Sequence, residues 1–341
     1  MTDALLPAPF AHPGLTEERG ELGLLAGEVF AGDPDADRAG AELGWFGIGI
    51  PERLGGSDGT LADLAPIVEA AGAAGSASAL GWSTGLLAPL LLAQGGPDGD
   101  SAAGALLGEI AAGRCTVALP VTDPWHAADS AHSASSPGAG LIVHGAAEPT
   151  VLLLPVLEDG EPVLEVVEAG GLKPVVGIDV SRRLHRVVPG ERAVRLRIRG
   201  AGLFERLSAG VGLIAALDSV GAAGQALHRT ISYAGTREQF GRPLGQFQAY
   251  KHRCASAFIR FRLAQSTAYR AVAESPDPTL ARSAALVGTS DCTWICGETV
   301  QLHGAIGFSW ETGLHVLLKR ARANQLLATA DQGRLVDALV S

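Results

Sequence analysis

Aromatic residues and basic runs are scarce in this sequence. Only 5% of the 341 residues are aromatic, and 26 lysines and arginines are outnumbered by 36 aspartates and glutamates. The formal charge of −10 argues against nucleic acid and anionic membrane surfaces as partners, because both carry negative charge and attract cationic proteins. We therefore expect no nucleic-acid partner.

Cysteines are also few. The four thiols form no metal-binding pattern, and so low a number in a long chain fits a reducing compartment. We therefore predict no metal site and a cytoplasmic location. The cysteines are Cys115, Cys254, Cys292 and Cys296.

Long apolar runs and targeting signals are missing from the pattern as well. Residues 1–13 contain prolines but no basic region, so we do not interpret them as a signal peptide. The apolar run near Leu86–Leu92 is interrupted by Pro89 and is too short to cross a bilayer. We expect no membrane span.

The composition favours closely packed helices. It is 47% hydrophobic, contains 45 glycines and has a mean hydropathy of +0.22. Apolar residues recur at helical spacing before residue 114 and after residue 203, whereas the intervening stretch has short β-rich runs between turn residues. This order predicts an α+β protein with an N-terminal helical domain, a small middle β-barrel or sandwich and a C-terminal four-helix bundle. The expected domains are 1–114, 115–200 and 201–341.

Two loops between the C-terminal helical segments carry the residues of a ligand site. Residues 237–248 read REQFGRPLGQFQ, and residues 301–308 read QLHGAIGF. Arginines match phosphate oxygens, glycines allow close approach of the backbone, and amides can bind polar ring edges. The loops suit a large, flat, anionic ligand. The alternative is that the arginines are helix-end charges and the glycines form ordinary turns.

These loops, in this order of helical and β segments, resemble the acyl-CoA dehydrogenase family. Gly44-Trp45 with Pro51-Glu52 and Gly55-Gly56 is similar to the family's N-terminal segment, and the two loops are similar to its "RxQFG" and "QxxGG" motifs. The resemblance covers about residues 40–330 and is weakest in the middle.

The resemblance implies an FAD-dependent enzyme that removes hydrogen across the α,β-bond of an acyl-CoA thioester. In this family the two loops of one subunit hold the FAD of its neighbour. By resemblance the FAD-binding residues are Arg237, Gln239, Phe240, Gln301 and Gly304, and the electron acceptor is an electron-transfer flavoprotein or a similar protein.

The catalytic base is missing from both positions where the family places it. One position, counted from Gln301, falls on Ala328, and the other, on the helix before the first loop, falls on Val211. The nearest carboxylates are Asp331 and Glu205, which require shifts along the chain that catalysis does not tolerate easily. We assign no catalytic residue and keep these two as weak candidates.

The middle region also departs from the family pattern. Residues 121–130, VTDPWHAADS, keep Thr122 and Pro124 of a flavin-covering loop but lose its glycines, and the strand expected after Gly145 is shortened or missing. Thr122 is retained as a candidate flavin contact, although it can equally be an ordinary strand-end hydroxyl.

The features lost are those a subunit uses on its own flavin, and those kept serve a neighbour. The sequence therefore resembles the short subunit without catalytic glutamate of actinobacterial α2β2 acyl-CoA dehydrogenases, some of which act on steroid side chains. The expected partner is a second chain that carries the glutamate. Two alternatives remain: a self-sufficient homo-oligomer that uses Asp331 or Glu205, and a scaffold without flavin.

Overall fold

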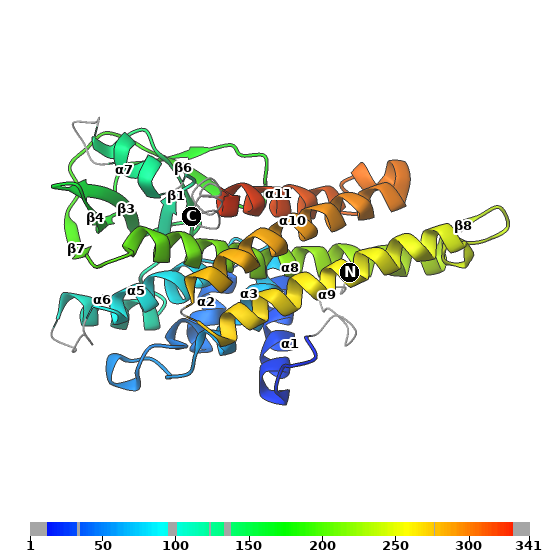
Figure 1. The fold of residues 1–341 in the computed structure, drawn as a ribbon, viewed down its shortest axis with the longest axis horizontal. Helices are drawn as coiled ribbons and strands as arrows, with labels where there is room; N and C mark the ends of the chain where they lie inside the picture. The colour runs from blue at the N-terminus through cyan, green and yellow to red at the C-terminus, as the bar shows by residue number, and fades with distance from the viewer. Residues whose placement is uncertain are drawn as a thin grey trace.

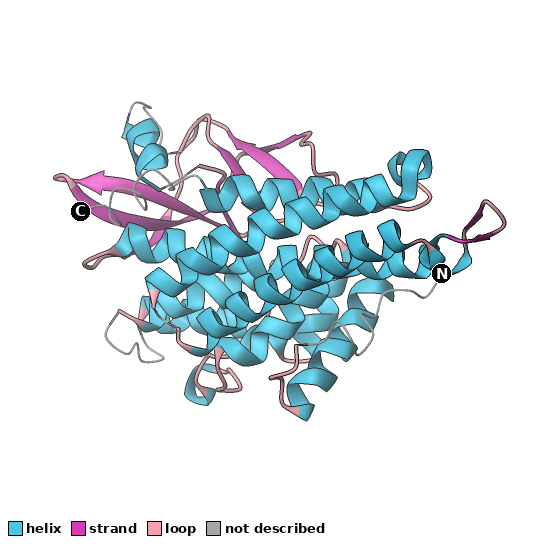
Figure 2. Ribbon diagram, turned by 45° about the vertical axis from the view of Figure 1, so that its right-hand side comes forward, coloured by secondary structure: helices cyan, strands magenta, loops and turns pink. Residues whose placement is uncertain are grey.

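The computed structural model describes residues 12–32, 35–94, 101–122, 124–132, 138–275 and 277–329. A helical part comes first, a β-sheet follows, and long helices complete the chain (Figure 1). The first and last parts pack together, and the sheet lies beside one end of the long helices (Figure 2). The predicted α+β architecture is confirmed.

The N-terminal part consists of short helices around one apolar core. Where α3 begins, the Asp63 carboxylate accepts hydrogen bonds from the N–H and the hydroxyl of Thr60, each at 2.8 Å. These bonds satisfy groups that a helix start leaves open. The elements are α1 (Glu17–Gly32), α2 (Ala36–Glu42), η2 (Trp45–Gly47), η3 (Glu52–Leu54), α3 (Leu61–Ala74), α4 (Leu80–Trp82), η4 (Ser83–Leu87), α5 (Ala88–Leu92) and α6 (Ala102–Ala111).

The middle part is one seven-stranded sheet with the order β5-β6-β2-β1-β3-β4-β7. Strands β1 and β3 pair in parallel, and the other neighbours pair antiparallel. Helix α7 (Pro124–His132) follows β1. The strands are β1 (Val117–Pro120), β2 (Ile142–Gly145), β3 (Val151–Glu158), β4 (Glu161–Glu168), β5 (Leu172–Val175), β6 (Arg183–Val187) and β7 (Val194–Ile198).

The C-terminal part contains α8 (Leu203–Thr236), α9 (Gln248–Ala273), α10 (Pro278–His303) and α11 (Leu314–Thr329). Helix α8 runs through the centre and packs against α3, α10 and α11. A Cβ atom at Gly221 would clash with the carbonyl of Glu69, and one at Gly72 with the carbonyl of Asp218. These two glycines therefore let α3 and α8 cross in close contact.

Helix α8 meets the length and composition expected of a membrane span, but 83% of its most apolar window is buried inside the fold. Its apolar character is explained by its central position. The first strand begins at Val117 and α8 begins at Leu203. The boundaries 1–114, 115–200 and 201–341 themselves stay predictions.

Candidate functional site

The hairpin β8–β9 extends beyond the ends of α8 and α9 (Figure 1). Strands Glu238–Gln239 and Arg242–Pro243 pair across Phe240 and Gly241, whose φ angles are +54° and +77°. Two central residues at positive φ suit a tight hairpin, but a side chain there costs about 1–2 kcal/mol. The Phe240 ring is 92% exposed. The hairpin thus holds an aromatic ring away from the core of its own chain.

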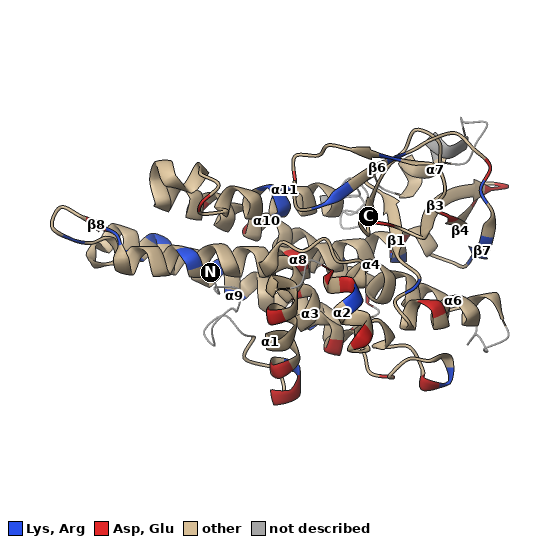
Figure 3. Ribbon diagram, turned by 180° about the vertical axis from the view of Figure 1, so that it is seen from behind, with Lys and Arg blue, Asp and Glu red and all other residues tan. Residues whose placement is uncertain are grey.

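Two arginines flank this turn. The Arg242 guanidinium lies 4.1 Å from the centre of the Phe247 ring, and the Arg237 carbonyl accepts a hydrogen bond from the Leu244 N–H at 2.8 Å. Both side chains are exposed, and neither pairs with a carboxylate in the described part of the chain. Figure 3 shows cationic residues on the hairpin and along α9, whereas acidic residues gather on α1 to α3. The hairpin can accept an anion.

The second loop follows α10 at the same end of the bundle. Gln301 and Gly304 are exposed, and Gly304 begins the short helix η6 (Gly304–Phe308) with φ +66°. The side chains of Phe308 and Trp310 are 64% and 71% exposed. Like the hairpin, this loop presents aromatic, amide and glycine groups outward.

A ring stack connects the two loops. The Tyr233 ring, four residues before Arg237, stacks on the His303 ring at 4.3 Å between centres and 20° between planes. His303 Nδ1 lies 2.9 Å from the Thr299 carbonyl, and burial lowers the pKa of the imidazole. A neutral ring with Nδ1–H donating to that carbonyl fits this geometry. The structure therefore fixes the two loops relative to each other.

Both positions expected for a catalytic base lie in one narrow cavity of about 30 Å³. Val211 from α8, Ala328 from α11 and Thr122 all line it, and none of them supplies a carboxylate. Glu205 lies in the first turn of α8 and is not among the lining residues, and Asp331 lies outside the described residues. The other lining residues are Leu119, Pro120, Pro124, Pro155, Leu207, Ser208 and Leu327.

The loop expected over residues 121–130 is different in the structure, where α7 begins at Pro124. Trp125 packs edge-to-face against Phe204 of α8, with ring centres 5.0 Å apart. Pro124 in the first helical position, with Ala127 and Ala128 in the next turn, favours a helix. The cavity beside it has roughly the volume of one water molecule. A flavin ring system and an acyl thioester do not fit there.

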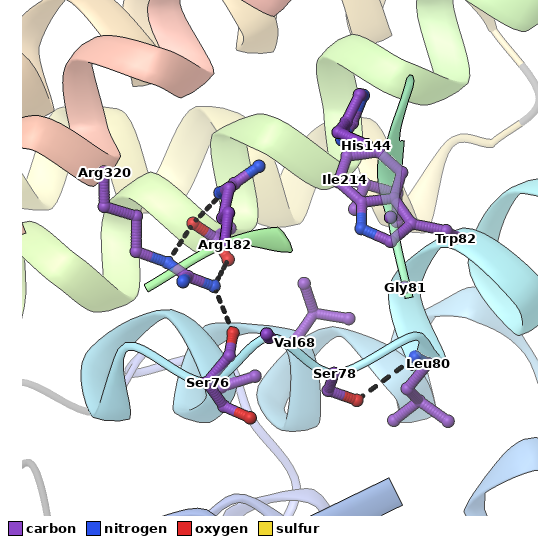
Figure 4. Close-up of a pocket in the computed structure, with 14 residues that line it drawn as sticks. Val68, Ser76, Ser78, Leu80, Gly81, Trp82, His144, Arg182, Ile214 and Arg320 are labelled. Atoms are coloured by element: carbon purple, nitrogen blue, oxygen red, sulfur yellow. Dashed lines mark hydrogen bonds and ion pairs between the residues drawn. The ribbon is translucent and has the colours of Figure 1, made fainter. Parts of the chain in front are cut away.

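A buried ion cluster lies where α3, the β-part, α8 and α11 meet (Figure 4). The Asp218 carboxylate accepts bidentate hydrogen bonds from the Arg320 guanidinium at 2.6 and 2.9 Å. It also accepts a hydrogen bond from Arg182 at 3.0 Å. Burial raises the pKa of Asp218, but Arg320 and Arg182 outweigh burial and hold the pKa below its usual value. Arg320 also donates to the Ser76 carbonyl at 2.6 Å. The cluster joins three separate parts of the chain.

His144 lies beside this cluster and is 2% exposed. Its ring packs edge-on against Trp82 at 4.8 Å, and its two nitrogens have no hydrogen-bond partner among the described residues. Burial, together with a smaller effect of the nearby Arg182, lowers the pKa of His144 to about 3. Sequence reasoning missed this cluster and His144, because the residues come from distant segments and follow no local pattern.

This fold and these two loops define the class of the protein. The acyl-CoA dehydrogenase N-terminal domain model matches residues 16–102, and the acyl-CoA dehydrogenase C-terminal domain model matches residues 207–332. The chain belongs to the acyl-CoA dehydrogenase family, a family of FAD-binding oxidoreductases that act on acyl-CoA.

Three known proteins show how this chain compares within the family. It is 32% identical over 294 residues to acyl-CoA dehydrogenase IpdE2 of Mycobacterium tuberculosis, covering 84% of this chain and 79% of the relative. The ChsE4–ChsE5 complex from Mycobacterium tuberculosis has a similar fold, with a TM-score of 0.78, 21% identity and coverage of 97% and 99%. The steroid ACAD variant Tcur3481–Tcur3483 gives a TM-score of 0.76, 23% identity and coverage of 95% and 98%.

The residues present fit one half of an FAD site. The exposed, unneutralised Arg237 and Arg242 suit a pyrophosphate, and the neighbouring loop adds an amide and a glycine. The cavity that Thr122 lines is too small for the ring system. Within the described ranges, no group of three or more His, Cys, Asp or Glu residues could hold a metal ion.

Proposed function

We propose that this chain is the non-catalytic subunit of a hetero-oligomeric acyl-CoA dehydrogenase and completes the FAD site of a second chain. The observation that carries the proposal is the cavity that Val211 and Ala328 share. Both base positions are apolar, and the space is about 30 Å³. The loops for a neighbour's cofactor are, in contrast, exposed and keep their arginine, amide and aromatic residues and Gly304, although Ala305 replaces the second glycine of the second motif.

The reaction moves a proton and a hydride. A carboxylate takes the α-proton of the thioester, and FAD, when bound, accepts the hydride from the β-carbon. In the proposed complex Arg237 and Arg242 bind the pyrophosphate, and Gln239, Gln301 and Phe240 contact the remainder of the cofactor. Gly304 allows the backbone to approach it. The glutamate base and the flavin-ring pocket belong to the partner.

The proposed partner is a second acyl-CoA dehydrogenase-like chain, in an α2β2 assembly located in the cytoplasm. The similarity to the ChsE4–ChsE5 complex supports a partner of this kind. The similarity to a steroid ACAD supports a bulky acyl-CoA, such as one with a steroid side chain, as substrate. An electron-transfer flavoprotein or a similar acceptor would take up the electrons.

The test is expression of this chain alone and together with an acyl-CoA dehydrogenase-like chain that has an intact glutamate. We expect yellow protein absorbing near 450 nm and acyl-CoA oxidation only from the coexpressed pair. Arg237→Ala should lower the flavin content of the pair. Arg53→Ala, which removes an exposed arginine on η3, is the matched control. Stoichiometric FAD with full activity in this chain alone would overturn the proposal.

The same measurements separate the two alternatives. A self-sufficient homo-oligomer requires that Asp331→Asn or Glu205→Gln abolish an activity of this chain alone. If the chain is a scaffold without flavin, it contributes nothing to flavin binding in the coexpressed pair. Arg237→Ala then has no effect on the absorbance of the pair at 450 nm.

A further inference from the structure

A second cavity, of about 740 Å³, lies between α3, the α4–α5 segment, α8 and the turn that joins α9 to α10. On α8, Arg206, Ala209 and Leu213 line it, whereas Leu207 and Val211 line the cavity of Thr122. At 100° per residue these two sets lie on opposite faces of α8. None of the described residues lines both cavities. The larger cavity is therefore separate from the cavity that the two base positions line.

Its walls are mainly apolar. Leucines from α3, η4, α5 and α8 line it together with alanines and other apolar residues, and its volume is in the range of sites that hold small molecules. Only a few polar side chains interrupt this lining. Examples of the apolar residues are Leu61, Leu64, Leu86, Leu90, Leu213 and Val272.

One wall contains an unusual turn. Residues 83–87 form a π-helical turn between α4 and α5, and Thr84, Gly85 and Leu86 of this turn line the cavity. The Thr84 hydroxyl donates to the Phe46 carbonyl at 3.1 Å and holds the turn in place. Single π-helical turns are rare and recur at functional sites.

One cation on the lining is not neutralised. Arg206 donates from Nη1 to the Ala201 carbonyl, while its Nε is buried without a partner and no carboxylate pairs with it in the described chain. The other charged lining residues are engaged. Arg19 pairs with Asp63 at 2.8 Å, and Asp277 accepts hydrogen bonds from N–H groups at the start of α10.

We infer that this cavity binds an amphipathic carboxylate. The apolar body packs against the leucines, and the carboxylate pairs with the guanidinium of Arg206 at the positive end of α8. The site binds its ligand without a covalent step. It does not depend on the proposed role in a neighbour's FAD site.

Binding is tested on the full chain with two carboxylates of different shape. The rigid 1-pyrenebutyrate is followed by fluorescence anisotropy, and the flexible dodecanoate by calorimetry and by its ability to displace 1-pyrenebutyrate. We expect a Kd on the order of 10–100 μM for at least one of them. Binding of 1-pyrenebutyrate alone identifies a fused-ring occupant, and binding of dodecanoate alone identifies an acyl chain. No binding of either at about 1 mM overturns the inference.

Variants locate the site. Arg206→Gln should weaken carboxylate binding about tenfold and leave dodecanol, the uncharged counterpart of dodecanoate, unaffected. Arg270→Gln removes a surface arginine that pairs with Glu274 and is the control. Ala62→Phe should fill the cavity and abolish binding, and Ala93→Phe at its exposed edge replaces it if the first variant does not fold. Unchanged binding in Arg206→Gln and in the cavity-filling variant contradicts the inference.

Discussion

Val211 on α8 and Ala328 on α11 line the same narrow cavity, together with Thr122 from the β-part. The family places its base at one or the other of these positions, and here both side chains are apolar. The cavity has room for about one water molecule. Loss of the base and loss of the space therefore occur at one location, as expected of a subunit that leaves catalysis to its partner.

A base restored at this location should not create a second active site. In the coexpressed pair, we expect Ala328→Glu to leave the turnover number and the flavin stoichiometry unchanged, because a carboxylate does not supply the missing space. Flavin content is measured by absorbance per mole of heterodimer, and Ala328→Gln serves as the uncharged control. A doubled flavin content in Ala328→Glu, with added activity, would contradict the proposed role.

The stack of Tyr233 on His303 should matter for flavin retention more than for stability. Tyr233→Leu keeps apolar volume but removes a ring–ring contact worth about 0.5–1.5 kcal/mol. Because the stack fixes the hairpin relative to the second loop, we expect the flavin Kd of the pair to rise several-fold.

The measurement is flavin release during dialysis, alongside urea unfolding of this chain. The control is Tyr250→Phe, which removes only the hydroxyl of a different tyrosine, on α9, and keeps its ring. The explanation fails if Tyr233→Leu retains flavin as well as the control does.

The helical parts could be predicted from sequence because apolar periodicity is local. Helical spacing after residue 203 predicts helices in that part of the chain, and α8, α9, α10 and α11 lie there. The hairpin residues Arg237 and Phe240 were found through their motif, and the structure places them on an exposed turn. That placement supports the FAD assignment, which itself stays a prediction.

Other features had no local signal. The cationic partners of Asp218, namely Arg182 and Arg320, are brought together only by the packing of α8 against the sheet and α11. The helix at Pro124 is an exception with a local signal, because a proline in the first helical position with alanines in the next turn favours a helix, but the resemblance to a loop of the family outweighed that signal. The large cavity depends on the spacing of four elements, which no single segment determines.

Removing the central carboxylate of the ion cluster should be strongly destabilising. Asp218→Asn removes the carboxylate that pairs with both buried guanidinium groups, Arg182 and Arg320, and leaves only the Asp179 carboxylate, which pairs with Arg182 at 3.1 Å, so we expect a loss of about 3–5 kcal/mol in the free energy of unfolding. Urea unfolding at neutral pH measures it. Asp35→Asn breaks an exposed pair with Arg38 and should cost less than about 1 kcal/mol. Equal effects of the two variants would show that the buried cluster contributes little.

His144 should make the protein sensitive to acid. Its pKa is about 3 in the folded chain and near 6.5 when exposed, so between these values the unfolded chain binds a proton that the folded chain does not. The free energy of unfolding therefore falls as the pH drops from 6.5 towards 3, by at most about 5 kcal/mol from this residue.

Glu69 acts in the opposite direction over part of this range. Burial raises its pKa to about 7, although Tyr269 and Gln265 donate hydrogen bonds to it, so the folded chain holds a proton between pH 4.5 and 7 that the unfolded chain releases. Stability from Glu69 is lost as the pH rises through that window. His144→Leu should flatten the acid side of the stability profile, and Glu69→Gln should flatten the decline towards pH 7. Urea unfolding at a series of pH values measures both profiles, and an unchanged acid limb in His144→Leu would show that other groups control the response.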